Sequence, residues 1–564
     1  MVCMQIGRRN RALFPPSPTR GTWNPLTLAF LASLWIATLA NWPLWRALHA
    51  LPEMQGGRGL LFIAAFGIGV ACLTALVLVL TAWRWSIKPA IGLFLLAAAF
   101  GAYFMGAYNV VIDSSMMTNV LQTDLRETRD LLNWRMALSV LLLAGLPIAW
   151  LWNRPLQAPG AWRQLLRNAV GWIAALLLLV AVVAASFADL ASTMRTHTSL
   201  RYLINPLNSF YALASLAHEA GARPAGPPQA IGTDVTLAAP AAGAKPRLLL
   251  LVVGETARAD HFALNGYDRP TNPGLSGRNV LSFRNVSSCG TSTATSLPCM
   301  FSHLGKQAFE AREQDSENLL DVLQRAGLAV LWLDNQAGCK GLCDRIPHDD
   351  AWRLADGAPP LPPGLCDGGE CLDEALLHGL DQRLAALPSE RRAKGVVLVL
   401  HQMGSHGPAY SKRSPAGRKP FLPECTTNVL QQCDRQQLVN AYDNSIAYTD
   451  GVLTQAIDWL GRQAAGYDPA LLYLSDHGES LGENNLYLHG LPYGIAPREQ
   501  KHVPMVLWLA PQTEAASGIA MACLAKQRDA ALSHDNLVPS VLGFMGAKTS
   551  VYRAALDVFA PCRP

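Results

Sequence analysis

Five long apolar segments in the first third of the chain constrain its fold more than any other feature. Each is long enough to cross a bilayer as a helix, because a membrane span needs about 20 apolar residues. A helix satisfies its own backbone hydrogen bonds in lipid, so these segments predict a helical membrane domain. The first is interpreted as an uncleaved anchor, because it is long and four more spans follow it. The expected spans are 25–44, 60–82, 90–108, 136–152 and 169–188.

Basic residues near the ends of these segments predict the orientation. Arginine and lysine concentrate in the cytoplasmic loops of membrane proteins. Here they precede the first span and separate the second from the third and the fourth from the fifth: Arg8, Arg9, Arg11, Arg20, Arg84, Lys88, Arg154, Arg163 and Arg167. With five spans, the rest of the chain is therefore expected outside the inner membrane. The net charge of +5 is modest and gives no indication of a nucleic-acid partner.

Composition divides the chain into four expected parts. Of the 564 residues, 50% are hydrophobic and only 15% are charged, which is too apolar for an ordinary soluble protein of this size. The expected parts are a cytoplasmic N-terminal extension over 1–22, a five-helix membrane domain over 23–190, an amphipathic helix and linker over 191–245, and a soluble domain over 246–564. The linker is assigned from its proline, alanine and glycine content.

The cysteines indicate an oxidising compartment for the soluble domain. Ten of the twelve lie between Cys289 and Cys562, several of them in close pairs. An even number of closely spaced cysteines in one domain predicts disulfides. A zinc cluster is the alternative, but the spacings vary and lack the paired C-x-x-C pattern of structural zinc sites.

Short apolar runs in the soluble domain predict buried strands of a largely parallel sheet. The runs are 248–253, 329–333, 396–400 and 471–474. Ligands of open α/β sheets bind outside the carboxyl ends of the strands. The polar residues just after these runs are therefore expected along one edge: Glu255, Asp334, His401, His406, Asp476 and His477.

The segment 287–301 is a candidate nucleophile loop. It holds four rival hydroxyl nucleophiles, Thr291, Ser292, Thr293 and Thr295. Free backbone N–H groups at a helix start suit an incoming phosphate. A threonine hydroxyl is a weak nucleophile at neutral pH, so it needs a base or a metal ion. For this segment alone, a Ser/Thr-rich surface loop is an equal alternative.

Three residues offer a metal site for that hydroxyl. Glu255, Asp476 and His477 supply hard oxygen and imidazole ligands suited to zinc, with a nucleophile oxygen in the remaining position. His406 and His489 form a second tier that would bind phosphate, take a second metal or protonate a leaving group. Lys340 is a candidate phosphate contact. Taken singly, a histidine is more often structural than a ligand, so the prediction rests on the group.

The loop between the third and fourth spans carries a polar pattern. Asn119, Thr123 and Glu127 are spaced i, i+4, i+8, so a helix here would place them in one stripe. Such a stripe would hold a polar head group at the membrane surface. An amphipathic helix resting on the bilayer is the more common alternative.

Several long motifs follow one another in the soluble domain: VGETARAD at 253–260, GYDRPTNP at 266–273, CGTSTATSLPCMF at 289–301, HQMGSHGP at 401–408, SDHGESLGEN at 475–484 and LHG at 488–490. The membrane part adds NWP at 41–43 and the loop with Asn119, Thr123 and Glu127. Together these motifs resemble the lipid A phosphoethanolamine transferases, a group that includes the mobile colistin-resistance enzymes, and the resemblance extends over nearly the whole chain.

The resemblance implies an α/β/α sandwich of the alkaline phosphatase/sulfatase type behind five transmembrane helices. The enzyme would be a monomer in the bacterial inner membrane, with its catalytic domain in the periplasm. It would move phosphoethanolamine from phosphatidylethanolamine to Thr293, releasing diacylglycerol, and then to a lipid A phosphate. This motif alignment selects Thr293 among the four hydroxyls.

The resemblance also implies roles for individual residues. Glu255, Thr293, Asp476 and His477 would bind zinc, and His406 and His489 would serve the phosphoethanolamine or a second zinc. Lys340 would contact phosphate, and Asn119, Thr123 and Glu127 would line the lipid-substrate site. The family's disulfides correspond to Cys289/Cys299, Cys339/Cys343, Cys366/Cys371 and Cys425/Cys433. Cys523 with Cys562 is inferred from the two cysteines that remain.

Three other functions compete with this interpretation. In the first, the acceptor is a core sugar of lipopolysaccharide or a periplasmic glucan. The catalytic motifs are shared by enzymes with these acceptors, so they do not distinguish them from lipid A. A phosphoglycerol transferase or a sulfatase-like hydrolase is a second alternative, although the chain has no short Cys/Ser-x-Pro-x-Arg nucleophile motif. The third is a membrane-tethered sensor of lipid head groups, which would have no need for a complete nucleophile and ligand set.

Overall fold

The computed structural model describes residues 21–563 apart from 124, 223–225, 240–242 and 368–369. It divides into two compact units. The membrane unit comprises Met1–Ala102, Leu138–Thr196 and Ile204–Pro206, and the sheet unit comprises Tyr103–Ala137, His197–Leu203 and Leu207–Pro564. The expected N-terminal extension lies outside the described residues up to residue 20. The other domain boundaries stay predictions.

The membrane unit contains the long apolar helices. In the described part of the chain, four helices are long and apolar enough to cross a membrane: Gly57–Leu80 (α3), Ile87–Tyr108 (α4), Trp134–Trp152 (α7 to α8) and Ala161–Ala185 (α9). A fifth span results if α1 (Pro25–Thr38) and α2 (Trp42–His49), which meet at a bend of 44°, count as one. The first expected span, 25–44, is therefore present as two helices that meet at a bend rather than as one straight helix.

Asn41 explains the bend. Its side-chain amide donates to the carbonyl of Ile36 at 2.9 Å and to that of Asn205 at 2.6 Å. Its amide oxygen accepts from the backbone N–H of Asn205 at 2.9 Å. These bonds satisfy backbone groups that a broken helix would otherwise leave unpaired in lipid. Pro43 then sits in the first turn of α2, where its missing N–H costs nothing.

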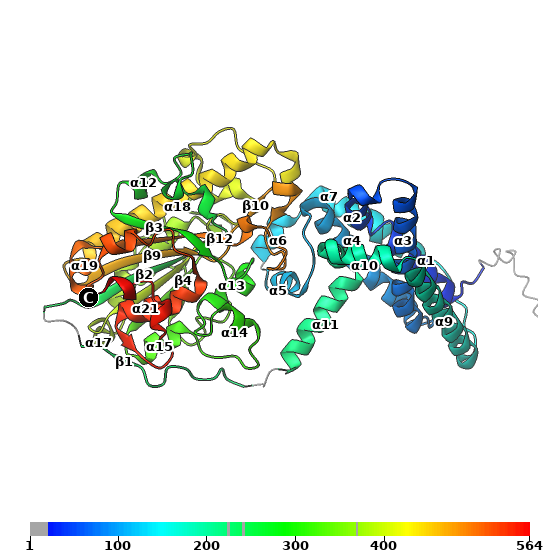
Figure 1. Ribbon diagram of the computed structural model, residues 1–564, viewed down its shortest axis with the longest axis horizontal. Helices are drawn as coiled ribbons and strands as arrows, with labels where there is room; N and C mark the ends of the chain where they lie inside the picture. The colour runs from blue at the N-terminus through cyan, green and yellow to red at the C-terminus, as the bar shows by residue number, and fades with distance from the viewer. Residues whose placement is uncertain (1–20, 124, 223–225, 240–242, 368–369, 564) are drawn as a thin grey trace, which may run out of the picture. The chain divides into compact units, whose positions relative to one another are not determined.

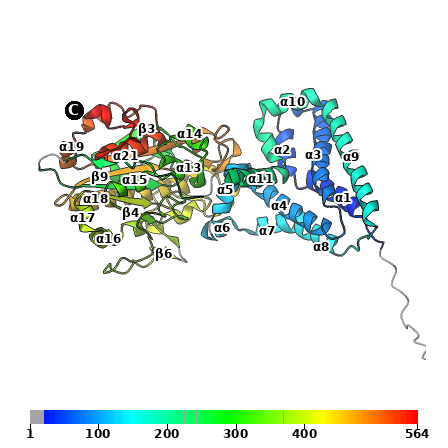
Figure 2. The ribbon, with the colours of Figure 1, turned by 90° about the horizontal axis from the view of Figure 1, so that it is seen from below.

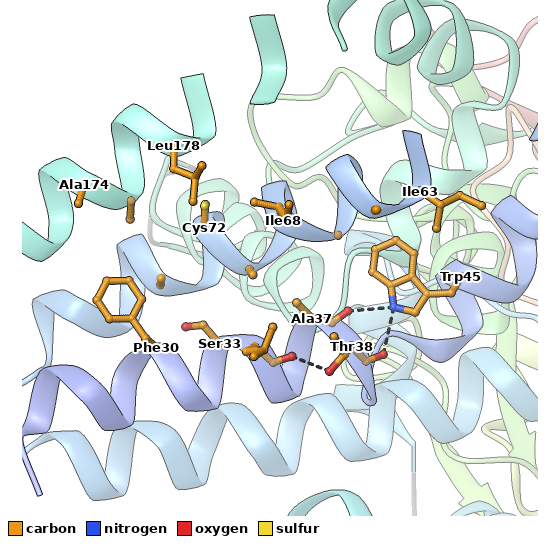
Figure 3. Close-up of a pocket in the computed structure, with 16 residues that line it drawn as sticks. Phe30, Ser33, Ala37, Thr38, Trp45, Ile63, Ile68, Cys72, Ala174 and Leu178 are labelled. Atoms are coloured by element: carbon orange, nitrogen blue, oxygen red, sulfur yellow. Dashed lines mark hydrogen bonds between the residues drawn. The ribbon is translucent and has the colours of Figure 1, made fainter. Parts of the chain in front are cut away.

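A cavity of about 520 Å³ lies between α1, α3 and α9 of the membrane unit (Figure 3). The hydroxyls of Ser33 and Thr38 donate to carbonyls of their own helix at 2.8 and 2.7 Å. The indole N–H of Trp45 donates to the carbonyl of Ala37 at 2.9 Å. These internal bonds leave an apolar lining, which includes Cys72, the free cysteine of the described residues.

The sheet unit is built on one eight-stranded sheet (Figure 1). Strand β12 is antiparallel to both of its neighbours, and the other pairings are parallel. The sheet is thus largely parallel, as expected. The order is β13 (Leu532–Ser533), β3 (Val280–Ser287), β12 (His502–Leu509), β9 (Asp468–Ser475), β2 (Arg247–Gly254), β8 (Val396–His401), β4 (Ala329–Asp334) and β5 (His348–Asp350).

Helices cover both faces of this sheet (Figure 2). Alternate side chains of β2 point to opposite faces, so Leu249 and Leu251 enter one core and Leu248 and Leu250 the other. The first core includes residues of α13 (Thr293–Met300), α15 (Leu319–Arg325) and α21 (Leu537–Met545), and the second includes residues of α16 (Leu380–Ala386) and α18 (Arg435–Gln463). Burial on both faces explains why the strands are continuous apolar runs.

The segment after α4 differs from the sequence expectation. Helix α5 (Ser114–Gln122) ends before Thr123, and α6 (Leu125–Leu131) begins after it. Thr123 has an extended backbone, and its hydroxyl donates to the carbonyl of Asn119 at 2.7 Å. This bond satisfies a carbonyl at the helix end, where no further turn follows. The expected single helical stripe through Asn119, Thr123 and Glu127 is therefore wrong.

Two further features fix the surroundings of the sheet edge. Helix α5 packs against α13 and against α11 (Leu207–Ala222). Five disulfides join ten cysteines of the sheet unit: Cys289–Cys299, Cys339–Cys343, Cys366–Cys371, Cys425–Cys433 and Cys523–Cys562.

Candidate active site

Three buried polar side chains meet at the carboxyl edge of the sheet. Glu255 follows β2, and Asp476 with His477 follows β9, its parallel neighbour. The pairing of Gly254 with Ser475 brings the two strand ends side by side. Nε2 of His477 lies 3.2 Å from Oε1 of Glu255 and 3.5 Å from Oδ2 of Asp476. The sheet therefore assembles two carboxylates and one imidazole in a site closed to solvent.

Thr293 faces this cluster from the first position of α13. Its hydroxyl donates to Oε2 of Glu255 at 2.8 Å and lies 3.4 Å from Nε2 of His477. Ser292 is the N-cap residue of the helix. The free N–H groups of the first helical turn are therefore close to the Thr293 oxygen. Such an end attracts an anionic group.

The rival hydroxyls of the loop are engaged elsewhere. The Thr291 hydroxyl donates to the carbonyl of Leu491 at 2.6 Å. The hydroxyls of Ser292 and Thr295 lie 3.1 Å from each other. Among the four rivals, Thr293 is the one whose hydroxyl contacts the carboxylate and imidazole cluster.

The charges of the cluster are strongly coupled. Burial alone would lower the pKa of His477, but the carboxylates of Asp476 and Glu255 outweigh it and raise the pKa to about 10. Burial raises the pKa of Asp476 to about 6, and the nearby Glu255 charge adds to the rise. Burial opposes ionisation of Glu255, yet the His477 contact lowers the pKa of that carboxyl below its usual value. The site is thus built to stabilise a positive charge between its carboxylates.

Buried atoms without hydrogen bonds mark where that charge would sit. Within the described residues, Oε1 of Glu255 and Oδ2 of Asp476 are buried and make no hydrogen bond, and their nearest charged neighbour is Nε2 of His477 at 3.2 and 3.5 Å. Unpaired carboxylate oxygens in a protein interior are costly unless a cation binds them. The ligand atoms of Glu255, Asp476 and His477 all lie within 4.8 Å of one another, which suits one metal ion.

His401 is a fourth candidate at this edge, and the sequence analysis placed it there without giving it a role. It ends β8, and its Nδ1 lies 3.0 Å from Oδ2 of Asp334 at the end of β4. The indole N–H of Trp332 donates to the same oxygen at 2.8 Å. The opposite ring atom, Nε2 of His401, is buried without a partner. A carboxylate behind a histidine is the usual arrangement for orienting a metal-binding imidazole.

His406 and His489 lie next to the cluster. The rings of His489 and His477 have centroids 4.4 Å apart, and those of His406 and His489 are 5.4 Å apart. Nδ1 of His489 lies 3.3 Å from Oε1 of Glu479. Burial lowers the pKa of His406 to about 3, so this imidazole is neutral at physiological pH. The structure thus brings both second-tier histidines to the site.

A glycine fixes the loop that carries His406. Gly404 has φ of +53°, and a Cβ there would lie 2.6 Å from the carbonyl oxygen of Glu255. The backbone N–H of Ser405 donates to that same carbonyl at 3.0 Å. The carboxylate of Asp373 accepts from the N–H groups of Met403 and Gly404 at 2.8 and 2.9 Å. The loop is therefore held directly against the backbone of Glu255.

The remaining predicted site residues lie around α5 and α6. Oε1 of Glu127 is 4.0 Å from Nε2 of His406. Nζ of Lys340 donates to the carbonyls of Ala337 at 3.0 Å and Gln122 at 3.4 Å. Asn119 and Thr123 bond to each other at the end of α5. The structure thus places Glu127 beside the histidines, and Lys340 beside the last turn of α5.

Two contacts of the cluster were missed by the sequence reasoning. The side-chain amide of Gln336 donates to Oε2 of Glu255 at 2.9 Å. Gln336 follows Asp334 and Asn335 at the end of β4. The expectation that polar residues just after the strands gather at one edge could therefore have included it. His534 contacts both the nucleophile loop and the end of β9. No neighbouring motif marks it in the sequence, because β13 is only two residues long.

A second cavity is lined in part by the nucleophile helix. It measures about 880 Å³ and is lined by residues of α5, α13 and the loops around them. Thr291, Thr295, Lys306, Lys340 and Tyr493 are among its lining residues. The cavity therefore combines hydroxyl and cationic side chains, and two of its lining threonines, Thr291 and Thr295, lie two positions before and after Thr293 in the chain.

Comparisons with known proteins agree with this arrangement. Residues 70–220 match the family model described as phosphoethanolamine transferase EptA/EptB, and residues 247–547 match the sulfatase model. Phosphoethanolamine transferase EptA of Escherichia coli K12 is 39% identical over 552 residues, covering 96% of this chain and 98% of its own. Phosphatidylethanolamine transferase Mcr-1 of Escherichia coli is 37% identical over 530 residues, covering 93% and 95%.

A solved structure extends the likeness to both units. The integral membrane protein lipooligosaccharide phosphoethanolamine transferase A from Neisseria meningitidis superposes with a TM-score of 0.89 at 34% sequence identity. The match covers 95% of this chain and 99% of that one. The membrane helices and the sulfatase-like sheet domain thus occur together in a solved relative.

Proposed function

We propose a specific reaction for this chain, which belongs to the phosphoethanolamine transferase family. The general activity is phosphoethanolamine transfer by a membrane enzyme. We propose that the donor is phosphatidylethanolamine, the acceptor is a phosphate of lipid A, and the cofactor is zinc. The observation that carries the proposal is the Thr293 hydroxyl, 2.8 Å from Glu255 at the start of a helix and beside a buried ligand cluster.

The ligand set favours zinc. Glu255, Asp476, His477 and the Thr293 oxygen would give four ligands of the oxygen and nitrogen type that zinc prefers. When bound, the ion would lower the pKa of the Thr293 hydroxyl and offset the charge of the transferred phosphate. The unpaired oxygens of Glu255 and Asp476 support this position. A second zinc at His406 and His489 is a further option, since imidazole is a common zinc ligand.

In the first step, Thr293 Oγ1 forms a bond to the phosphorus of phosphatidylethanolamine. The bond from phosphorus to the diacylglycerol oxygen breaks, and diacylglycerol leaves with a proton. Glu255 accepts the hydrogen bond of the Thr293 hydroxyl and so directs its lone pairs toward the donor. The free N–H groups at the start of α13 bind the phosphate oxygens. The product is phosphoethanolamine carried on Thr293.

In the second step, a phosphate oxygen of lipid A forms a bond to that phosphorus and the bond from phosphorus to Thr293 Oγ1 breaks. The proton that the acceptor phosphate loses passes to Thr293 Oγ1 and restores the hydroxyl. His406 and His489 are the proton-carrying side chains next to the cluster, with rings 5.4 Å apart. Burial lowers the pKa of His406 to about 3 and so keeps the ring neutral at pH 7. A neutral imidazole has one N–H and one acceptor nitrogen, so His406 would relay a proton between its two ring nitrogens rather than hold a positive charge. Glu479 holds Nδ1 of His489 and so orients that ring.

The ethanolamine group needs a negative partner. Glu127 lies 4.0 Å from His406, and its carboxylate suits an ammonium group. Lys340, whose Nζ donates to the carbonyl of Gln122 in the last turn of α5, would contact phosphate. Asn119 and Thr123 would line the lipid-binding side of the same segment. The acceptor sugar phosphate would enter the cavity of about 880 Å³ beside Thr295.

Location follows from the membrane helices and the disulfides. The basic loops predict that the soluble domain is periplasmic, and the five disulfides suit an oxidising compartment. We therefore place the protein in the bacterial inner membrane with its sheet domain in the periplasm. A monomer would be sufficient, because every proposed catalytic side chain comes from one chain.

Mass spectrometry of lipid A tests the proposal. A Gram-negative host would express the chain, its Thr293→Ala variant or its Thr293→Ser variant at matched membrane levels. The proposal predicts added phosphoethanolamine with the intact chain, reduced addition with Thr293→Ser and none with Thr293→Ala. Unmodified lipid A with the intact chain would reject the acceptor, and modified core sugars or glucans in the same extracts would identify the alternative.

A further inference from the structure

His534 is a buried histidine that no step of the proposed reaction uses. It begins the short helix η12 (His534–Asn536) directly after the edge strand β13, and it is 1% exposed. Strand β13 runs parallel to β3, with Ser533 opposite Ser287. The histidine therefore lies beside the loop that leads from β3 to Thr293.

The ring of His534 connects two separate chain segments. Nδ1 lies 3.0 Å from the backbone nitrogen of Cys289, and Nε2 lies 2.9 Å from the carbonyl oxygen of Ser475. A backbone N–H only donates and a carbonyl only accepts, so Nδ1 is the acceptor and Nε2 carries the proton. One neutral ring thus joins the start of the nucleophile loop to the residue just before Asp476.

Ser296 makes a second connection between the same segments. Its hydroxyl donates to the backbone carbonyl of Asp476 and accepts from the backbone N–H of Gly290 at 3.2 Å. The hydroxyl also lies 3.3 Å from Nδ1 of His534. Ser296 is fully buried and belongs to the same helix as Thr293, one turn later.

We propose that His534 and Ser296 are positioning residues that hold Thr293 in register with Asp476 and His477. The inference rests on the proposed function, because it concerns how that reaction is set up. Neither side chain touches a reacting atom. Both side chains bond to the backbone of the nucleophile loop, at Cys289 or Gly290, and to the backbone at the end of β9, at Ser475 or Asp476.

The structure gives a physical reason why such bridges are needed. Glu255, Asp476 and His477 follow strands that are hydrogen-bonded to each other, but Thr293 comes from a loop and a helix of eight residues. Among the described residues no strand pairing fixes this helix against the ends of the strands; side-chain packing, loop hydrogen bonds and the Cys289–Cys299 disulfide hold it. A misplacement of about 1 Å between reacting groups costs about 100-fold in rate.

A pair of substitutions with matched shape isolates the hydrogen bonds. Asparagine and leucine have similar size, but in His534→Asn the amide oxygen takes the place of Nδ1 and still accepts from Cys289. In His534→Leu neither bond is possible. His348→Leu and His348→Asn serve as controls, because His348 lies in the edge strand β5 at the opposite end of the sheet and bonds the carbonyl of Ile346 at 3.0 Å.

The full-length variants would be compared in detergent with a fluorescent phosphatidylethanolamine donor and purified lipid A. We expect His534→Leu to lower kcat about 100-fold with KM within about threefold, and His534→Asn to recover at least about tenfold of that loss. Ser296→Ala should lower kcat about tenfold. The rise in melting temperature on adding zinc to chelator-treated protein should be smaller in His534→Leu than in His534→Asn.

Equal kcat for His534→Leu and His534→Asn, at equal folded fraction, would overturn the inference. If His534→Leu does not fold, unchanged kcat in both His534→Asn and Ser296→Ala would overturn it instead. Failure of the proposed function gives a different result, namely no transfer by the unsubstituted chain. In that case the rise in melting temperature on adding zinc tests the inference. An equal rise in all variants would reject the positioning role of the His534 and Ser296 hydrogen bonds.

Discussion

The buried cluster and the α5–α6 segment contribute to the same site by different physical means. The cluster residues follow neighbouring strands, so backbone hydrogen bonds of the sheet place Glu255 beside Asp476. The segment is held by side chains. Asp130 of α6 is 2% exposed and pairs with Lys412 and with Arg413, the latter at 2.9 Å. Arg413 in turn donates to the carbonyl of His406 at 2.8 Å.

Because they are held differently, the two regions should respond differently to substitution. When one ligand of the cluster is changed, the sheet keeps the other ligands in place, so the rate of the chemical step falls. When an ion pair of the α5–α6 segment is broken, the segment shifts, so substrate binding becomes weaker. We therefore expect changes in kcat from the first region and changes in KM from the second.

Removal of the metal should have the largest effect. Chelation leaves the carboxylates of Glu255 and Asp476 buried without a cation, so we expect loss of transfer activity and its return with zinc. A ligand at about 100 times its Kd stabilises a fold by about 3 kcal/mol, so the melting temperature should fall as well. Activity measurements and thermal unfolding with and without chelator test this. Full activity in protein shown by elemental analysis to lack metal would reject the metal site.

Glu255→Gln should come next. The amide keeps the shape but removes the negative charge that accepts from Thr293 and would bind the metal, so kcat should fall about 100-fold or more. Steady-state kinetics with Glu390→Gln as control would measure this, since Glu390 is exposed in α17 (Ser389–Arg392) and lines neither cavity. Comparable kcat values for the two variants would contradict the assignment.

Glu127→Gln should change binding rather than chemistry. Loss of the carboxylate near His406 removes the proposed ammonium contact, so we expect KM for the donor to rise about tenfold with kcat within about twofold. A donor without the amine, such as phosphatidic acid, distinguishes the cause. The variant and the unsubstituted chain should handle that donor equally, and a difference between them would exclude an ammonium contact.

Asp130→Asn should have a smaller effect of the same kind. The change leaves Arg413 without its buried partner, and α6 then holds Glu127 less firmly. We expect KM for the donor to rise about threefold and hydrogen exchange in α6 to quicken. In a double-mutant cycle with Arg413→Gln the effects should be coupled by about 1 kcal/mol or more. Additive effects would show that the pair does not act through a shared contact.

Arg418→Gln should have the smallest effect. The loop around this residue is basic, but the structure pairs Arg418 with Glu374 and Lys419 with Glu424. Exposed ion pairs contribute about 0–1 kcal/mol. Kinetics on lipid A vesicles should therefore change by less than about twofold, whereas a tenfold loss of acceptor binding would show that Arg418 contacts the lipid.

The parts of the site that follow strands could be predicted from the sequence. Apolar runs marked the strands, and their parallel pairing necessarily gathers the residues that follow them at one edge. Glu255, His401 and Asp476 were placed correctly on that edge for this reason. The antiparallel strand β12 does not disturb the argument, because no predicted site residue follows it.

The parts that depend on tertiary hydrogen bonds could not be predicted. Spacing alone suggested one helix through Thr123, but a hydroxyl-to-carbonyl bond at Asn119 ends α5 there. Asn41 bends the first apolar segment through bonds to Asn205, which is 164 residues away. His534 lies 245 residues from Cys289 and 59 residues from Ser475, the two residues that its ring connects. Periodicity carries no information about partners at such separations.

The most direct test of the account is the covalent intermediate on Thr293. Purified protein would be incubated with phosphatidylethanolamine in the absence of lipid A, quenched in acid, digested and analysed by tandem mass spectrometry. We predict a phosphoethanolamine group on Thr293, absent from the Glu255→Gln variant and lost when lipid A is added before quenching. An adduct on Thr291, Ser292 or Thr295, or transfer to lipid A with no adduct under any quench, would contradict it.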